Sequence, residues 1–323
     1  MNLLKQLLRK REAMIFLVVL MIFFFLSLAT PFFLTRANLL AVLISMSVEV
    51  IIAVAMTNLL ISGGFDLSVG SVLCFSGLIS AIFWRAGVPP VLAIIGGVLC
   101  GTLVGVFNGI LVAYIRITPF VATLASLNIF RGLVYIITQG KSIAGLPAEY
   151  RFLGQKTIFG VQMPIIFAIF FVIAGDVILR RFRFFRQNYY IGGNEKAAQL
   201  SGINVTRMKI INYMLTGFFA GFAGVVQAGR LGSAMVTSGE GMEMRVLTAV
   251  IIGGASLSGG EGTILGAFLG AILMALVTNG VNILGVNVYW QTFIVGSTLL
   301  VAVLIDSFGK HQRSSRQKIT TGA

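Results

Sequence analysis

The sequence is poor in charged residues, and this scarcity excludes an ordinary water-soluble protein. Only 11% of its 323 residues are Asp, Glu, Lys or Arg, whereas 57% are hydrophobic. A soluble domain carries roughly 25% charged residues, so this chain lacks the polar surface that an aqueous fold needs. The 38 glycines suit closely packed membrane helices. The composition predicts an all-α integral membrane protein.

Residues for metal or nucleophilic chemistry are also scarce. Cys74 and Cys100 lie in apolar runs without metal-ligand spacing or a disulfide framework, and the single histidine is His311 in the polar tail. A zinc site, a haem or a Ser–His–Asp triad within the membrane is therefore not expected. A membrane transferase would need clustered Asp, Glu or His, and we find no such cluster in the sequence. We expect no enzyme and no cofactor bound by this chain itself.

The net charge of +14 comes from basic residues dispersed between apolar stretches. Nucleic-acid-binding proteins gather such charge on one surface, so we expect no nucleic acid partner. With residue 1 in the cytoplasm, alternating spans place 16 Lys and Arg residues inside and 7 outside. This bias favours a multi-pass protein with both termini in the cytoplasm.

A bilayer core requires about 20 apolar residues per helix, fewer where a helix stops inside protein. By that rule the sequence predicts about ten spans: 13–33, 38–61, 67–85, 90–115, 119–138, 163–180, 210–231, 245–257, 262–284 and 289–306. The first is longer than the about 7–15 apolar residues of a signal peptide. We therefore interpret it as a retained span, with cleavage near Ser27-Leu28-Ala29 as the alternative.

The whole chain, 1–323, is expected to form one transmembrane domain. It would have a cytoplasmic N-terminal segment at 1–12, a cytoplasmic loop at 181–209 and a cytoplasmic tail at 307–323. The loop predicts a short helix that Asn194 caps and Gly202 ends. Glu195 favours the N-terminus of this helix, and its body consists of Ala197, Ala198 and Leu200.

Two Gly-rich segments, Ile61–Gly70 and Ile252–Gly260, interrupt apolar stretches and resemble each other. Asn108-Gly109 likewise resembles Asn279-Gly280. Such interruptions at matching places in two halves are typical of transporters and point to the substrate route. They predict broken or re-entrant segments and a weak internal repeat, and its orientation, parallel or inverted, stays open.

Glycines recur every four residues in two of the expected spans, at Gly97, Gly101, Gly105 and Gly109 and at Gly262, Gly266 and Gly270. Small-residue stripes let helix backbones approach closely. We expect them to pack helices within one chain, with dimer contacts as the alternative.

A few polar residues lie in or beside the expected spans. Asp66 or Ser68 is interpreted as the N-cap of the third helix, with a gate or pathway role for Asp66 as the alternative. Arg131 must face the interior, pair with an acid or extend to the interface. Glu49 and Glu243 are rare acids in or near the spans, and either could pair with an arginine. The pathway candidates are Phe65, Asp66, Ser68, Asn108, Thr123, Asn128, Arg131, Asn279 and Gln291.

The segment Gly63–Ser71, GGFDLSVGS, resembles a signature of the ribose-type sugar branch of bacterial ABC importer permeases, within the branched-chain amino acid and ribose permease superfamily. The resemblance covers nearly the whole chain in the right order. It continues through Thr123-Leu124, Phe130-Arg131-Gly132, Gly192–Ala198 (GGNEKAA), Ser201-Gly202-Ile203, Ala249–Gly254, Ser258-Gly259-Gly260 and Asn279-Gly280.

This resemblance implies a permease of the inner membrane, embedded in lipid, that imports a monosaccharide by alternating access. It implies a second permease subunit (identical or different), ABC ATPase subunits that bind ATP and Mg, and a periplasmic or lipid-anchored sugar-binding protein. The GGNEKAA segment resembles the coupling helix on which the ATPase docks. That role is carried onto Gly193, Asn194, Glu195, Ala197, Ala198, Ser201 and Gly202.

A stand-alone secondary transporter or channel for a small polar solute is the alternative. It would use a carboxylate or histidine relay inside the membrane. The expected spans contain no histidine and few acids, which favours the importer subunit.

Overall fold

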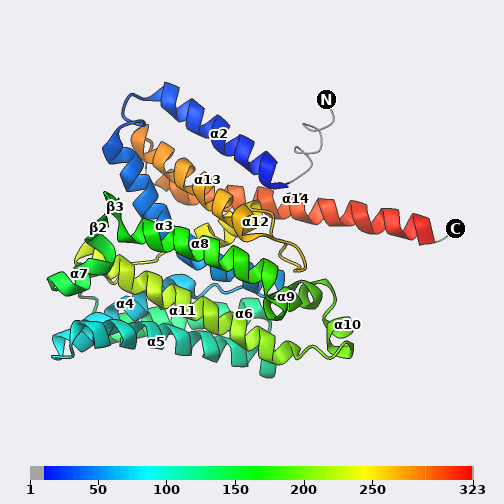
Figure 1. Cartoon of the computed structure of the whole chain (residues 1–323), viewed down its shortest axis with the longest axis horizontal. Coiled ribbons are helices and arrows are strands. Elements are labelled where there is room, and N and C mark those ends of the chain that lie inside the picture. Colours follow the sequence, from blue (N-terminus) through cyan, green and yellow to red (C-terminus); the bar gives the residue numbers. More distant parts are fainter. Residues whose placement is uncertain (1–10, 288, 322–323) are drawn as a thin grey trace.

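The computed structural model describes residues 11–287 and 289–321, which form an almost wholly helical bundle (Figure 1). The helices are α2 (Arg11–Ala29), α3 (Arg36–Ile61), α4 (Val69–Arg85), α5 (Pro90–Gly109), the π-helix η1 (Ile110–Tyr114), α6 (Pro119–Thr138), α7 (Ala148–Gln155), α8 (Met163–Arg181), α9 (Arg183–Gly193), α10 (Glu195–Leu200), α11 (Val205–Leu231), α12 (Met242–Ile252), α13 (Ile264–Ile283) and α14 (Tyr289–Thr321). Two-residue strands form two antiparallel pairs, β1 (Ile143–Ala144) with β4 (Ser233–Ala234) and β2 (Thr157–Ile158) with β3 (Val161–Gln162).

Each of the ten predicted spans corresponds to a helix. Among the described residues, seven helices are long and apolar enough to cross a membrane: α2, α3, α5 continued by η1, α6, α8, α11 and α13. Two shorter apolar helices, α4 and the 289–304 part of α14, and the 11-residue α12 account for the other three. The all-α membrane fold is therefore confirmed, with α12 shifted toward the N-terminus from the predicted 245–257.

The bundle has two distinct ends, which we name by the short helices at each (Figure 1). The α7 end carries α7, β2 and β3, and the α10 end carries α9 and α10. α11 runs from the α10 end to the α7 end and packs on α3, α4 and α5. The core therefore lies along α11 and α3.

The helices at the two ends of the described chain meet the bundle at the α10 end. Thr263 Oγ1 donates to Glu12 of α2 at 3.1 Å, and Ser256 Oγ donates to Asp306 of α14 at 2.8 Å. The ten predicted spans, an even number, require the two ends of the chain to lie on the same side of the membrane. α14 continues as one helix through the predicted tail at 307–323 as far as Thr321. Most of the predicted segment 1–12 lies outside the described residues.

Both glycine stripes pack helices within this chain. A Cβ on Gly101 would overlap Gly217 and Gly221 of α11, and a Cβ on Gly266 would overlap Gly253 at the end of α12. The absence of side chains lets α5 approach α11, and α13 approach α12, at backbone distance. The expectation of packing inside one chain is confirmed for these contacts.

This packing predicts opposite effects for two matched substitutions. Gly105→Ala would place a methyl group against the Tyr213 carbonyl oxygen and the Gly217 Cα, so it should destabilise the fold by about 1–3 kcal/mol. Gly132→Ala on α6 meets open space, so its better helix propensity should leave stability unchanged or raise it by up to about 1 kcal/mol. Unfolding of both purified variants in detergent measures the difference. A loss of equal size in both would contradict the packing account.

Candidate functional site

The first helix break, between α3 and α4, is held by a buried polar network. Asp66 accepts from the Ser68 amide at 2.7 Å and from Ser68 Oγ at 2.6 Å, and its second oxygen accepts from Asn108 Nδ2 at 3.2 Å. Asn108 also donates to Ser68 Oγ at 2.9 Å and accepts from Ser126 Oγ of α6. Tyr213 of α11 donates to the Phe65 carbonyl at 3.0 Å. The network joins the break to three further helices.

The expectation that Asp66 or Ser68 caps the third helix is wrong in detail. Ser68 is the N-cap residue of α4, but its side chain makes no capping hydrogen bond to that helix. The Asp66 carboxylate accepts a hydrogen bond from the Ser68 amide, before α4 begins, and so stabilises the turn there. Its other oxygen accepts from Asn108 of α5. Both residues are almost completely buried. A carboxylate with this many donors is tolerated inside the bundle.

The second break, Gly253–Thr263, touches the first break through the backbone. The Gly260 amide donates to the Ile61 carbonyl at 2.8 Å, at the end of α3. Gly192 of α9 lies at the same point, since a Cβ there would overlap both the Ile61 carbonyl oxygen and the Gly260 nitrogen. We call this three-way backbone contact of Gly192, Ile61 and Gly260 the junction.

Two contacts show that the helices leading into the two breaks, α3 and α12, run in the same direction. Glu49 pairs with Arg245 and Ile61 pairs with Gly260, so α3 and α12 run in the same direction toward the α10 end. This favours the parallel form of the repeat. Asn108 and Asn279 are not equivalent, however, because Asn108 lies at the first break while Asn279 bonds Asn38 near the α7 end.

α9 is tied firmly to the body of the bundle. Asn188 and Asn212 of α11 exchange two hydrogen bonds of 3.3 and 2.9 Å, and both side chains are buried. Tyr189 donates to the Gly262 carbonyl of the second break at 2.8 Å. Burial raises the pKa of the Tyr189 hydroxyl, so it keeps its proton and remains a donor at neutral pH. These hydrogen bonds connect α9 to α11 and to the second break.

The short helix predicted after α9 is present as α10, with the expected cap. Asn194 accepts from the Ala197 amide at 3.0 Å, and Gly202 follows the helix with φ of +84°. Lys209 of α11 bonds Glu195 at 2.7 Å and holds the start of α10 against the bundle. Residue choice and capping chemistry were sufficient to place this helix.

The coupling candidates on this segment divide between a buried and an exposed set. Ala198 is 3% exposed and packs with Ile191, Val205 and Met208, so it holds α10 in place and offers no surface. The exposed candidates are Gly193, Asn194, Glu195, Ala197, Ser201 and Gly202. Leu200 was not among the candidates, yet it is 91% exposed at the end of α10.

Three pathway candidates on α6 bond their own helix or the loop between β4 and α12. Arg131 donates to the carbonyls of Val236 and Ser238, both at 3.0 Å, and so fixes the loop between β4 and α12. Asn128 is exposed and donates to Leu124 of its own helix at 2.9 Å. Thr123 is buried and bonds the Pro119 carbonyl at 2.8 Å. Within the described part of the chain, none of the three side chains hydrogen-bonds the network at Asp66, whereas Ser126 of the same helix does.

A charged cavity lies toward the α7 end of the bundle. Glu49 of α3 accepts from Arg245 Nε of α12 at 2.6 Å, which confirms that Glu49 pairs with an arginine. Cavities of about 240, 210 and 260 Å³ surround this pair. Asn279 lines one of them and Gln291 another, and Thr278 lines both of these cavities. The other four candidates, Phe65, Asp66, Ser68 and Asn108, line none of the three.

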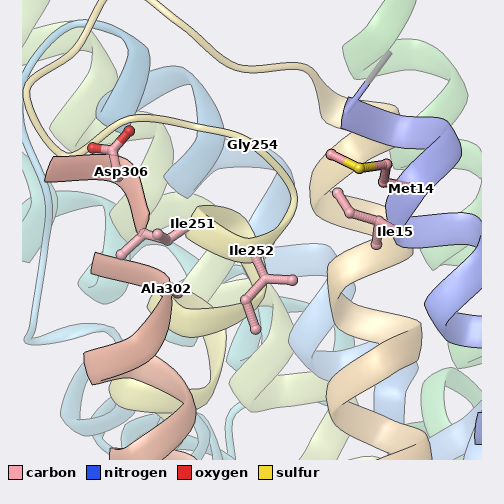
Figure 2. Close-up of a pocket in the computed structure, with 7 residues that line it drawn as sticks. All are labelled: Met14, Ile15, Ile251, Ile252, Gly254, Ala302 and Asp306. Carbon is pink, nitrogen blue, oxygen red and sulfur yellow. The ribbon is translucent and has the colours of Figure 1, made fainter. Parts of the chain in front are cut away.

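A further cavity of about 210 Å³ lies between α2, α12 and α14, near the second break (Figure 2). Its lining is apolar except at Gly254 and Asp306, with Met14 and Ile15 of α2 facing Ile251 and Ile252 of α12. Such a lining does not match a hydroxyl-rich solute. The polar cavities around Glu49 are the better match.

Comparison with known proteins gives consistent relatives. The ribose import permease protein of Bacillus subtilis (strain 168) is 40% identical over 90% of this chain and 91% of its own length. The D-allose transport system permease protein of Escherichia coli (strain K12) is 35% identical over 90% of both chains. The L-arabinose ABC transporter permease protein of Azospirillum brasilense is 38% identical over 93% of this chain and 88% of its own. No solved structure matches this chain.

Residues 38–303 match the family described as branched-chain amino acid transport system / permease component. The matched range begins in α3 and ends in α14, so it includes both breaks, the junction, α10 and the charged cavity. The chain belongs to this family of transport system permease components.

Proposed function

We propose that the chain is the permease subunit of a bacterial ATP-binding-cassette importer that carries a monosaccharide across the inner membrane. The observation that carries this proposal is the junction, where the segment leading into α10 touches both helix breaks. Relatives named for ribose, D-allose and L-arabinose support the sugar class.

The α10 end faces the cytoplasm in this proposal. The α8–α11 region at that end is rich in basic residues: Arg180, Arg181, Arg183, Arg186, Lys196, Arg207 and Lys209. Positive charge beside membrane spans favours retention on the cytoplasmic side. Both ends of the chain would then lie in the cytoplasm.

The permease works with other chains. A second permease subunit completes the pathway, ABC ATPase subunits dock on α10 and its neighbours, and a sugar-binding protein delivers solute at the α7 end. ATP and Mg bind to the ATPase subunits. Membrane lipid covers the exposed apolar faces of helices such as α2 and α6.

Coupling follows from the contacts of α9 and α10. When the ATPase pair closes on ATP, it displaces Leu200 and the exposed face of α10. α9 moves with α10 because only Asn194 separates them, and Gly192 transmits this movement to Ile61 and Gly260. Both breaks then shift together, and the pathway opens toward the α7 end. This is alternating access driven from the α10 end.

ATP-dependent sugar uptake tests this function against a stand-alone secondary transporter or channel. We expect vesicles with the permease, its ATPase and its binding protein to take up D-ribose, D-allose or L-arabinose only with ATP inside. Radiolabelled sugar measures uptake, and vesicles with the permease alone are the control. Uptake by the permease alone, driven by an ion gradient, would contradict the proposal.

Leu200→Asp tests the docking surface. A carboxylate at this exposed apolar position should remove about 2 kcal/mol or more of docking free energy, as at other interface hot spots. The ATPase should then no longer co-purify, while the permease keeps its wild-type melting temperature. Ala198→Asp is less informative, because it places the charge in a buried contact with Met208.

Phe159→Asp is the matched control for Leu200→Asp. Phe159 is also fully exposed, but it lies between β2 and β3 at the α7 end. This variant should retain the ATPase. Wild-type ATPase binding by Leu200→Asp would show that Leu200 is not a docking contact.

A further inference from the structure

The charged cavity toward the α7 end has features that neither packing nor coupling explains. Glu49 lies in the middle of α3 and Arg230 in the last turn of α11, two helices long and apolar enough to cross a membrane, and Arg245 lies in the first turn of α12. A charge at the centre of such a helix, the position of Glu49, costs roughly 2.5–3.5 kcal/mol on insertion scales. A buried ion pair can often be replaced by apolar residues without loss of stability. Stability alone therefore does not account for this set of charges.

The cavities are arranged around these three residues. Glu49 and Arg230 line both the cavity of about 240 Å³ and the one of about 260 Å³, and Arg245 lines the latter and the one of about 210 Å³. The three spaces therefore meet at the charged groups, which face open volume on more than one side. Side chains in that position are available to a solute.

Arg230 has free hydrogen-bonding capacity in this cavity. Its guanidinium makes one weak contact, 3.5 Å to Gln227 of its own helix, and no ion pair to a carboxylate is found among the described residues. A guanidinium carries five donors, so most of those of Arg230 are unused. Glu49, by contrast, is held by Arg245, and its carboxylate retains acceptor sites.

The walls of the cavity are fixed by contacts from other elements. Arg131 binds the loop carbonyls of Val236 and Ser238, and the Tyr135 hydroxyl donates to Glu240 at 3.2 Å. β1 pairs with β4 at the start of the same loop. A loop held at several points presents its polar groups in a preorganised arrangement, which favours binding of a small solute.

We propose that Glu49, Arg230 and Arg245 form a sugar-contact site in the α7-end half of the pathway, and we call it the outer charged site. Its ligand class is a neutral, polyhydroxylated ring. Arg230 donates to hydroxyl oxygens, and the Glu49 carboxylate accepts from adjacent hydroxyl groups. The Glu49–Arg245 pair also joins α3 to α12, so the site loosens when these helices separate. The inference rests on the proposed sugar import. It adds to that function the place at which the permease contacts the sugar.

Two variants of the complete importer test the outer charged site. Arg230→Gln removes the free guanidinium without leaving a partner carboxylate unpaired. The double variant Glu49→Arg with Arg245→Glu keeps the ion pair but exchanges the positions of acid and base. Arg36→Gln, an exposed arginine at the start of α3, is the control.

Uptake of D-ribose, D-allose and L-arabinose is measured in vesicles with ATP, together with ATP hydrolysis and melting temperature. We expect both variants to fold, assemble and hydrolyse ATP like wild type. Their sugar uptake should fall by about tenfold, the effect of losing one hydrogen bond from a charged group. If the Glu49–Arg245 pair served only to hold α3 against α12, the exchanged pair would hold the helices equally well. The double variant would then keep wild-type sugar uptake, which would contradict a sugar-contact role for the pair.

Three other outcomes are decisive. Wild-type uptake by Arg230→Gln, as in Arg36→Gln, would overturn the outer charged site and leave sugar import intact. If the double variant fails to fold, the uptake of Arg230→Gln alone is compared with that of Arg36→Gln. A tenfold lower uptake supports the outer charged site, and equal uptake overturns it. A wild-type importer that takes up none of the three sugars would overturn the proposed function, and with it the sugar assignment of this site.

Discussion

The rest of the structure depends on one backbone contact, the junction of Gly192, Ile61 and Gly260. The hydrogen bond from the Gly260 amide to the Ile61 carbonyl holds the two helix breaks together, and Gly192 of α9 lies against both. No side chain separates the three segments. Such contact leaves little room for one segment to move without the others, since packed interiors are not continuously deformable. The breaks and the segment before α10 therefore behave as one mechanical unit.

Two groups of polar side chains inside the bundle differ in whether their hydrogen bonds are satisfied within the group. The network of Asp66, Ser68 and Asn108 is closed, because each group bonds the others, and it fixes the first break. The outer charged site is open, because Arg230 and Glu49 face cavities. In a membrane, where water does not satisfy polar groups, a closed network serves structure and an open one serves a solute.

Local rules were sufficient to predict the ten spans and α10. Hydropathy placed the ten spans, and the Asn194 cap with Gly202 placed α10. Contacts between distant segments were beyond these rules. Glu49 and Arg245 are 196 positions apart, and Asp66 was assigned to a cap because its partner Asn108 comes from another helix. The exposed face of α10, with Leu200 outward and Ala198 inward, is set by the helices beneath it.

The most direct test of the account is the number of sugar molecules imported per ATP hydrolysed by Gly192→Ala and Gly132→Ala importers. A Cβ on Gly192 would enter the junction, whereas a Cβ on Gly132 of α6 meets open space. The account predicts that Gly192→Ala binds the ATPase and hydrolyses ATP but imports little sugar, while Gly132→Ala keeps the wild-type ratio. A wild-type ratio in Gly192→Ala would contradict coupling through the junction.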